Sequence, residues 1–318
     1  MTTALSRAAS WHRPLLYFVL AMAGLAVLAA AGVLLDDRVI TGAPAWLKPF
    51  KFAVSFVLYA GTLAWLLTLL PRRSRLVERS VTVIVAASVV EMVIIVGQVL
   101  RGRASHFNED TPLDAVLWNS MGAAIMVLFA AHFLLAFVVL RSRIVDRTVR
   151  YAVGLGVLLS LVGMLAAVPM VVPSAEAAAA GVGGAHSVGV PDGGAGLPLV
   201  GWSTTGGDLR VGHFVGLHAL QALPLLALLL HRLRHRWDET TRARLVLVAG
   251  AAYGVLTVML TVQALRGQPL LRPDAATLGG FLLLAAATAV ATRAVLATRA
   301  VLAARPQPAV AAAGMLVR

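Results

Sequence analysis

The chain has 318 residues, of which 59% are hydrophobic and 13% are charged, and its mean hydropathy is +0.86. This composition excludes an ordinary soluble domain and predicts an all-α, multi-pass membrane protein. The net charge of +13 comes mainly from arginines that border the apolar stretches, so anionic lipid headgroups explain it better than nucleic acid does. The lack of cysteine excludes disulfides and thiolate metal sites.

Eight apolar stretches are long enough to cross about 30 Å of hydrocarbon as helices. They cover residues 14–35, 50–70, 81–100, 113–140, 151–173, 211–230, 244–266 and 276–297. Of the 27 lysines and arginines, 19 fall on one side of this arrangement and 8 on the other. The positive-inside rule therefore predicts a bacterial inner-membrane protein with cytoplasmic ends, 1–13 and 298–318, and an extracytoplasmic loop at 174–210.

The second predicted helix begins with the only two lysines of the chain, Lys48 and Lys51. A chain that otherwise uses arginine places two compact, titratable charges one turn apart here, which points to a function for Lys51. A lysine at a helix end can also extend to lipid headgroups, and this alternative stays open for Lys48. Ser55 lies four residues after Lys51 and shares its helix face.

The third predicted helix carries Glu91 in the middle of an apolar run. A carboxyl group at this depth is costly and marks a functional site whose partner has to be found. Counting about 1.5 Å per residue from the outer helix ends places His218 of the sixth helix at the same depth. We therefore expect Glu91 and His218 to face a cavity open to the outside, with Lys51, Asn119 and Gln221 in its wall.

Candidate site residues follow from this depth argument. The catalytic candidates are Glu91, His218 and Lys51. The ligand-binding candidates are Asn119, Gln221, His213, His106, Arg101, Gln98 and Ser55. His132 lies at another depth, where an interhelical hydrogen bond is expected instead.

A short motif occurs twice, 165 residues apart. Gln98, Arg101 and Gly102 end the third predicted helix, and the same residue types at 263, 266 and 267 end the seventh. The repetition predicts two tandem, parallel four-helix halves, 14–140 and 141–297. The alternative is that helix ends converge on similar residues by chance.

Established catalytic signatures are missing from the sequence. The chain has no HExxH motif and no recognisable Ser-His-Asp set. His231 and His235 form its only HxxxH pair, and the interleaved arginines favour a border facing lipid headgroups over a metal site.

Four segments, WLKPFKF, SHFN, PDGGAGLPLVGW and GHFVGLHALQ, carry a resemblance to a family of uncharacterised bacterial multi-pass membrane proteins. The resemblance runs from about Ala45 to Leu230 and implies no activity. In architecture alone the chain is similar to heme A synthase. It departs from that family because it lacks a paired set of histidines in each half, which argues against heme ligation.

Three functions remain open from the sequence. A membrane redox enzyme, or an enzyme that modifies a lipid or a quinone, would use Glu91 and His218 for proton transfer or ligation, and heme or a metal ion would be its candidate cofactor. A proton-coupled transporter would need polar residues that continue toward the cytoplasm. A sensor or assembly subunit would bind its partner through the outer loops. We favour a site that opens outward.

Overall fold

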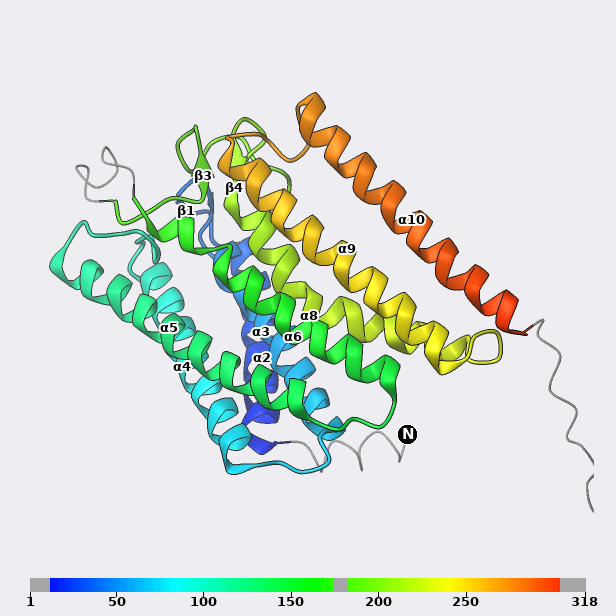
Figure 1. The fold of residues 1–318 in the computed structure, drawn as a ribbon. Coiled ribbons are helices and arrows are strands. Elements are labelled where there is room, and N and C mark those ends of the chain that lie inside the picture. The colour runs from blue at the N-terminus through cyan, green and yellow to red at the C-terminus, as the bar shows by residue number, and fades with distance from the viewer. Residues whose placement is uncertain (1–11, 174–181, 304–318) are drawn as a thin grey trace, which may run out of the picture.

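The computed structural model describes residues 12–173 and 182–303 (Figure 1). The predicted cytoplasmic ends, apart from a few residues, and the start of the predicted outer loop lie outside these ranges. The protein is an all-α, multi-pass membrane protein: eight of the described helices are long and apolar enough to span a membrane. They are α2 (Arg13–Leu35), α3 (Leu47–Leu69), α4 (Arg75–Leu100), α5 (Pro112–Arg141), α6 (Arg147–Leu165, followed by the short helix η1, Val168–Val171), α8 (Leu209–Arg232), α9 (Glu239–Leu265) and α10 (Ala275–Ala303).

Several helices begin before the apolar stretches that predicted them. The side chains of Ser74, Asp146 and Asp238 accept hydrogen bonds from backbone N–H groups in the first turns of α4, α6 and α9. These caps satisfy donors that have no partner inside the helix, so each helix gains a charged first turn that hydropathy alone does not include.

The described connections on one side of the membrane-spanning helices lie at one end of the molecule, which we call the loop end (Figure 1). They are residues 36–46, 101–111, 166–173, 182–208 and 266–274. Two short antiparallel pairs lie there, β1 (Val39–Ile40) with β2 (Ala43–Pro44), and β3 (Ser187–Val188) with β4 (Gly207–Asp208). Arg38 Nη1 donates to the Val99 carbonyl at 3.1 Å, which fastens the first connection to the end of α4. The opposite end carries most of the arginines, and we call it the basic end.

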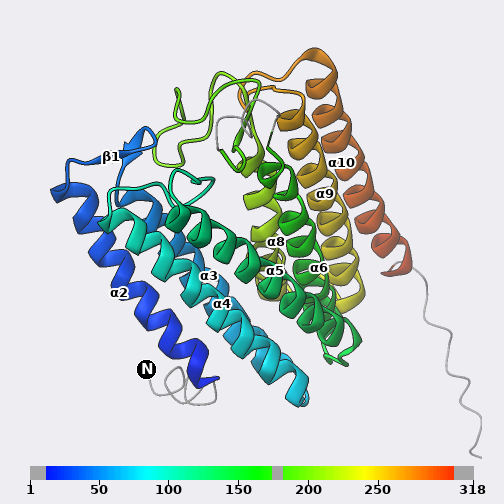
Figure 2. The same ribbon diagram turned by 90° about the vertical axis from the view of Figure 1, so that its left-hand side faces the viewer.

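The helices pack in two groups that share a pattern. In the first, α2 contacts α3 and α4, α3 contacts α4, and α4 contacts α5. In the second, α6 contacts α8 and α9, α8 contacts α9, and α9 contacts α10. Contacts of α5 with α6 and of α3 with α8 join the groups, and α10 lies at the edge against α9 (Figures 1 and 2). Thus α3 borders both α4 and α8, which makes it central to any site between the groups.

Two glycines bring α6 and α8 close together. A Cβ atom on Gly163 would lie within 3 Å of the backbone of Gly216 and Leu217, and one on Gly216 would meet Gly163 equally closely. Small residues let membrane helices gain dispersion contacts that a side chain would prevent. The backbone of α8 is therefore fixed against α6 just below the loop end.

Candidate functional site at the loop end

Lys48 lies at the centre of the charged groups near the loop end. It is half-buried in the first turn of α3. Its ammonium group interacts electrostatically with the carboxyl groups of Glu91 and Asp192. It also acts on the imidazoles of His106 and His186. We call these five residues the Lys48 cluster; two helices and two loops contribute to it.

Glu91 is the deepest acidic member of the cluster. The residue is 1% exposed on α4, and its Oε1 atom has no hydrogen-bond partner among the described residues. Lys48 is the charged group that acts on it. No hydrogen bond joins Glu91 to its predicted partner His218 among the described residues, and the charge that acts on Glu91 comes from α3, the helix that packs against α4. A buried carboxyl oxygen without a partner is a site where a ligand could donate a hydrogen bond.

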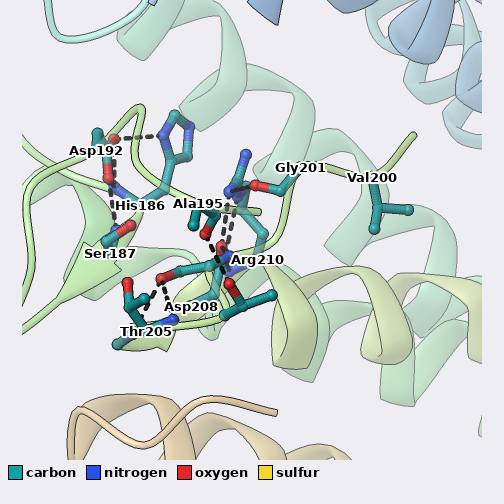
Figure 3. Close-up of polar contacts among 12 residues, drawn as sticks. His186, Ser187, Asp192, Ala195, Val200, Gly201, Thr205, Asp208 and Arg210 are labelled. Carbon is teal, nitrogen blue, oxygen red and sulfur yellow. Dashed lines mark hydrogen bonds and ion pairs between the residues drawn. The ribbon is translucent and has the colours of Figure 1, made fainter. Parts of the chain in front are cut away.

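A histidine and an aspartate form a hydrogen-bonded pair in the long loop above the helices (Figure 3). Asp192 Oδ2 accepts from His186 Nδ1 at 2.7 Å, and the same carboxylate accepts from the backbone N–H groups of His186 and Ser187. Because Nδ1 donates to the carboxylate, the neutral ring carries its lone pair on Nε2. This nitrogen is therefore the one available to a ligand.

Burial and neighbouring charges set the ionisation of this pair. Burial lowers the pKa of His186, and the positive charges of Lys48 and Arg210 lower it further, while the bond from Asp192 partly opposes them. Burial alone would raise the pKa of Asp192, but its hydrogen bonds with His186 outweigh burial and hold the pKa below its usual value. At neutral pH the pair is thus an uncharged imidazole oriented by a carboxylate, the arrangement of a general base.

His106 adds a second imidazole inside an aromatic group. Its ring centroid lies 5.6 Å from that of Phe52 and 5.7 Å from that of Trp118, and Phe107 packs at 4.8 Å against His186. Burial, together with the charge of Lys48, holds the pKa of His106 well below its usual value. The cluster is thus bordered by flat rings that can hold an apolar or planar ligand.

An ion pair holds the loop over the helices. Arg210 Nη2 lies 2.6 Å from Asp208 Oδ2 and donates to the Gly201 carbonyl at 2.6 Å (Figure 3). Lys51 Nζ donates to the Val200 carbonyl at 3.3 Å. These bonds tie residues 200–201 of the loop to α3 and α8. Lys51 thus positions the loop, whereas Lys48 acts on the acidic groups through its charge and forms no ion pair with them within 4 Å among the described residues.

The predicted site residues on α8 bond to one another and to groups on α6 and α3. His213 Nδ1 lies 2.7 Å from the Gly163 carbonyl, and His218 Nδ1 lies 3.3 Å from Gln221 Oε1. Gln221 Nε2 donates to Thr62 Oγ1 at 3.2 Å, which links α8 to α3. Gln221 thus bonds to α3 and not to Glu91, and Ser55 is half-buried on α3.

The predicted positions of three further residues need correction. Asn119 is exposed on α5, where its amide donates to the Ala115 carbonyl of the same helix, so it does not line a wall with Glu91. Gln98 and Arg101 both donate to Asp114 Oδ1, at 2.9 and 2.8 Å. They close the turn from α4 into α5 instead of forming a free rim, because the acid that opens α5 supplies their acceptor.

His132 behaves as the sequence predicts. Its Nδ1 lies 2.8 Å from the Tyr59 hydroxyl and its Nε2 lies 2.9 Å from the Ser160 hydroxyl. Ser160 donates onward to the Val157 carbonyl of its own helix. The chain of bonds joins α3, α5 and α6 and ends on the backbone.

Sequence reasoning missed Asp192 and the role of Lys48. The available signal was the PDGG turn, which places Asp192 six residues after His186 in the predicted extracytoplasmic loop. Among the described residues, no three histidine, aspartate or glutamate side chains converge in a way that could hold a metal ion.

No family model, curated protein or solved structure matches the chain. The resemblance drawn from its short segments stays a prediction. Its function therefore has to be argued from the site itself.

Proposed function

We propose that the protein is a membrane enzyme that modifies the head group of a lipid or a quinone by acid–base chemistry at the extracytoplasmic side. The observation that carries this proposal is Glu91, a buried carboxyl group with an unpartnered oxygen under the influence of the Lys48 charge. Intramembrane ionisable residues are rare and mark functional sites. Here the residue lies below a second acid–base pair, His186 with Asp192.

The location of the Lys48 cluster favours a ligand that comes from the bilayer. The cluster lies where α3 and α4 meet the loop end, at the level where apolar helices give way to polar loops. A lipid or quinone has its reactive group at this level and its apolar tail in the membrane. The rings of Phe52, Phe107 and Trp118 suit a planar or apolar portion of such a ligand.

Each member of the cluster has a role in this proposal. His186 accepts a proton at Nε2 while Asp192 holds the ring. Lys48 stabilises negative charge that develops on the head group. Glu91 gives or takes a proton at the deepest polar atom of the ligand. His106 lies beside them as a neutral hydrogen-bonding group.

A transporter is less well supported. The deeper polar residues, Tyr59 with His132 and Thr62 with Gln221, hydrogen-bond to one another. The chain from Tyr59 ends on a backbone carbonyl within α6. This pattern favours interhelical contacts over a path for protons or solutes.

The test is to identify what the purified protein retains. Wild-type protein, Glu91→Gln and Glu78→Gln would be extracted in a mild detergent, and bound lipids and quinones would be quantified by mass spectrometry. Glu78 lies on the same helix at the basic end and receives the same substitution, so it is the matched control. We expect a compound that wild type and Glu78→Gln retain and that Glu91→Gln loses. Equal retention by all three proteins would contradict the proposal.

An optical spectrum and metal analysis of the same samples distinguish an enzyme with a redox cofactor from one that uses side chains alone. A heme or flavin absorbance, or a stoichiometric metal, would assign the chemistry to a redox cofactor. A spectrum of protein alone, without metal, would agree with acid–base chemistry carried by the side chains.

A further inference from the structure

A second polar site lies at the basic end, far from the Lys48 cluster. Arg242, in the first turn of α9, is 7% exposed, and its Nε atom has no hydrogen-bond partner among the described residues. Its Nη1 atom lies 3.1 Å from Nδ1 of His231 on α8. A guanidinium group buried without an anion is costly, so the local structure indicates a missing partner.

A second guanidinium group approaches the same histidine. Arg234 Nη1 lies 3.4 Å from His231 Nε2, so each ring nitrogen faces an arginine. A guanidinium group only donates, and a neutral imidazole has one lone pair. Only one of these two contacts can therefore be a hydrogen bond. In the other contact, the N–H group of the imidazole faces an N–H group of the guanidinium, and the two repel each other. An anion between the groups would remove this conflict.

Neither Arg234 nor Arg242 forms an ion pair with an acidic side chain within residues 12–173 and 182–303. Glu239, in the same first turn as Arg242, has Oε1 occupied by the backbone N–H of Arg147 at 2.7 Å. The buried Nε donor of Arg242 is therefore a group that an anionic ligand can accept from.

We propose that Arg234, His231 and Arg242 form a binding site for a phosphate group; we call it the Arg242 site. Guanidinium groups bind phosphate through two parallel hydrogen bonds, and the imidazole can donate a third. The ligand is either the phosphate of an anionic lipid or a free phosphate, which share this chemistry. The site is independent of the proposed enzymatic function because it lies at the opposite end of the helices.

The experiment has two arms with the same three proteins. Wild type, Arg242→Ala and Arg244→Ala would be placed in phosphatidylcholine nanodiscs and titrated with inorganic phosphate by calorimetry. In the second arm, retained phosphatidylglycerol would be counted by native mass spectrometry after exchange into detergent. Arg244 is exposed on the same helix, so its substitution removes the same charge outside the site.

We expect Arg242→Ala to weaken binding about tenfold or more, the effect of losing hydrogen bonds to a charged group, and Arg244→Ala to leave it nearly unchanged. Weaker phosphate binding by Arg242→Ala in calorimetry would identify free phosphate as the ligand. A loss of retained phosphatidylglycerol alone would identify a lipid headgroup. If Arg242→Ala does not fold, Arg234→Ala replaces it, because this side chain is exposed. Equal losses in the two variants, or no binding in either arm, would overturn the proposal.

Discussion

Glu91 and Lys48 are two ionisable groups that the fold shields from water and places within each other's electrostatic influence. Each group is expensive to hold away from water, and each reduces the cost of the other without a direct hydrogen bond between them. Such groups persist in a fold when they serve a ligand, because an apolar pair would pack at least as well. The burial of Glu91 within the influence of Lys48 therefore supports a functional role for the Lys48 cluster.

The coupling between these residues can be measured by a double-mutant cycle. We expect Lys48→Met and Glu91→Gln to be non-additive by about 0.5–3 kcal/mol of unfolding free energy, the range for interacting groups. Thermal unfolding in detergent measures the four proteins of the cycle. Lys51→Met is the control, since Lys51 bonds to the loop and Glu91 has Lys48 as its charged neighbour. An additive Lys48 cycle would mean that the two charges do not interact.

The His186 pair predicts a pH dependence of ligand binding. Because the pKa of His186 lies below its ordinary value, the ring stays neutral at pH 7, and binding should fall only as the pH drops below about 6.5. Asp192→Asn removes a group that raises this pKa, so the fall should move to still lower pH. Retention of the bound compound across a pH series reads this out. A fall that moved to higher pH in Asp192→Asn would contradict the assigned pairing.

The sequence predicted the ionisable candidates better than their partners. Counting residues along a helix gave the depth of Glu91 and His218, but depth does not say which helices are neighbours. Asn119 has a suitable depth and faces outward, which a nearly uniformly apolar helix cannot reveal. Asp192 was missed because its partner, His186, lies in a loop whose folding depends on tertiary contacts.

At the scale of elements, polar caps and glycines decide where helices begin and how closely they pack. Hydropathy predicted all eight spans, yet it omitted the capped first turns of α4, α6 and α9. It also extended the fifth span through residues that form η1. The position of a helix N-terminus depends on the capping hydrogen bonds of single polar residues, and the mean hydropathy of a long window does not detect them.

The glycine contact between α6 and α8 gives a stability prediction. Gly163→Ala places a methyl group against the backbone of Leu217, so we expect a loss of about 1–3 kcal/mol from overpacking. Gly122→Ala is the matched control on α5, because no atom lies within 4 Å of its added Cβ. Thermal unfolding in detergent compares the two. A Gly163→Ala protein as stable as Gly122→Ala would show that the helices can separate freely.

At the scale of the whole molecule, the two helix groups have the same pairings, and the repeated motif forms the same structure twice. Gly102 and Gly267 both adopt a φ of 70°, which favours glycine. The preceding arginines bond to the acid that opens the next helix, Arg101 to Asp114 and Arg266 to Asp274. We propose that 14–140 and 151–297 are tandem halves. An experimental structure in which the aligned halves fail to superpose these motifs would contradict it.

The orientation in the membrane is a second prediction at this scale. The arginine bias places the basic end in the cytoplasm. Because the chain has no cysteine, single cysteines report topology without background. Leu199→Cys, at an 81% exposed position of the loop end, should react with an impermeant maleimide on intact cells. Val145→Cys, at a 95% exposed position of the basic end, should react only after lysis. The reverse pattern would invert the topology.

The most direct test of the central claim is turnover of a membrane compound that depends on Glu91. Cells expressing wild type, Glu91→Gln or Glu78→Gln at equal levels would be compared for their lipid and quinone pools by mass spectrometry. We predict that wild type and Glu78→Gln convert the same compound, and that Glu91→Gln lowers the conversion by 100-fold or more, about the contribution of a positioned acid or base. Pools that are the same for all three proteins would contradict an enzyme acting at this site.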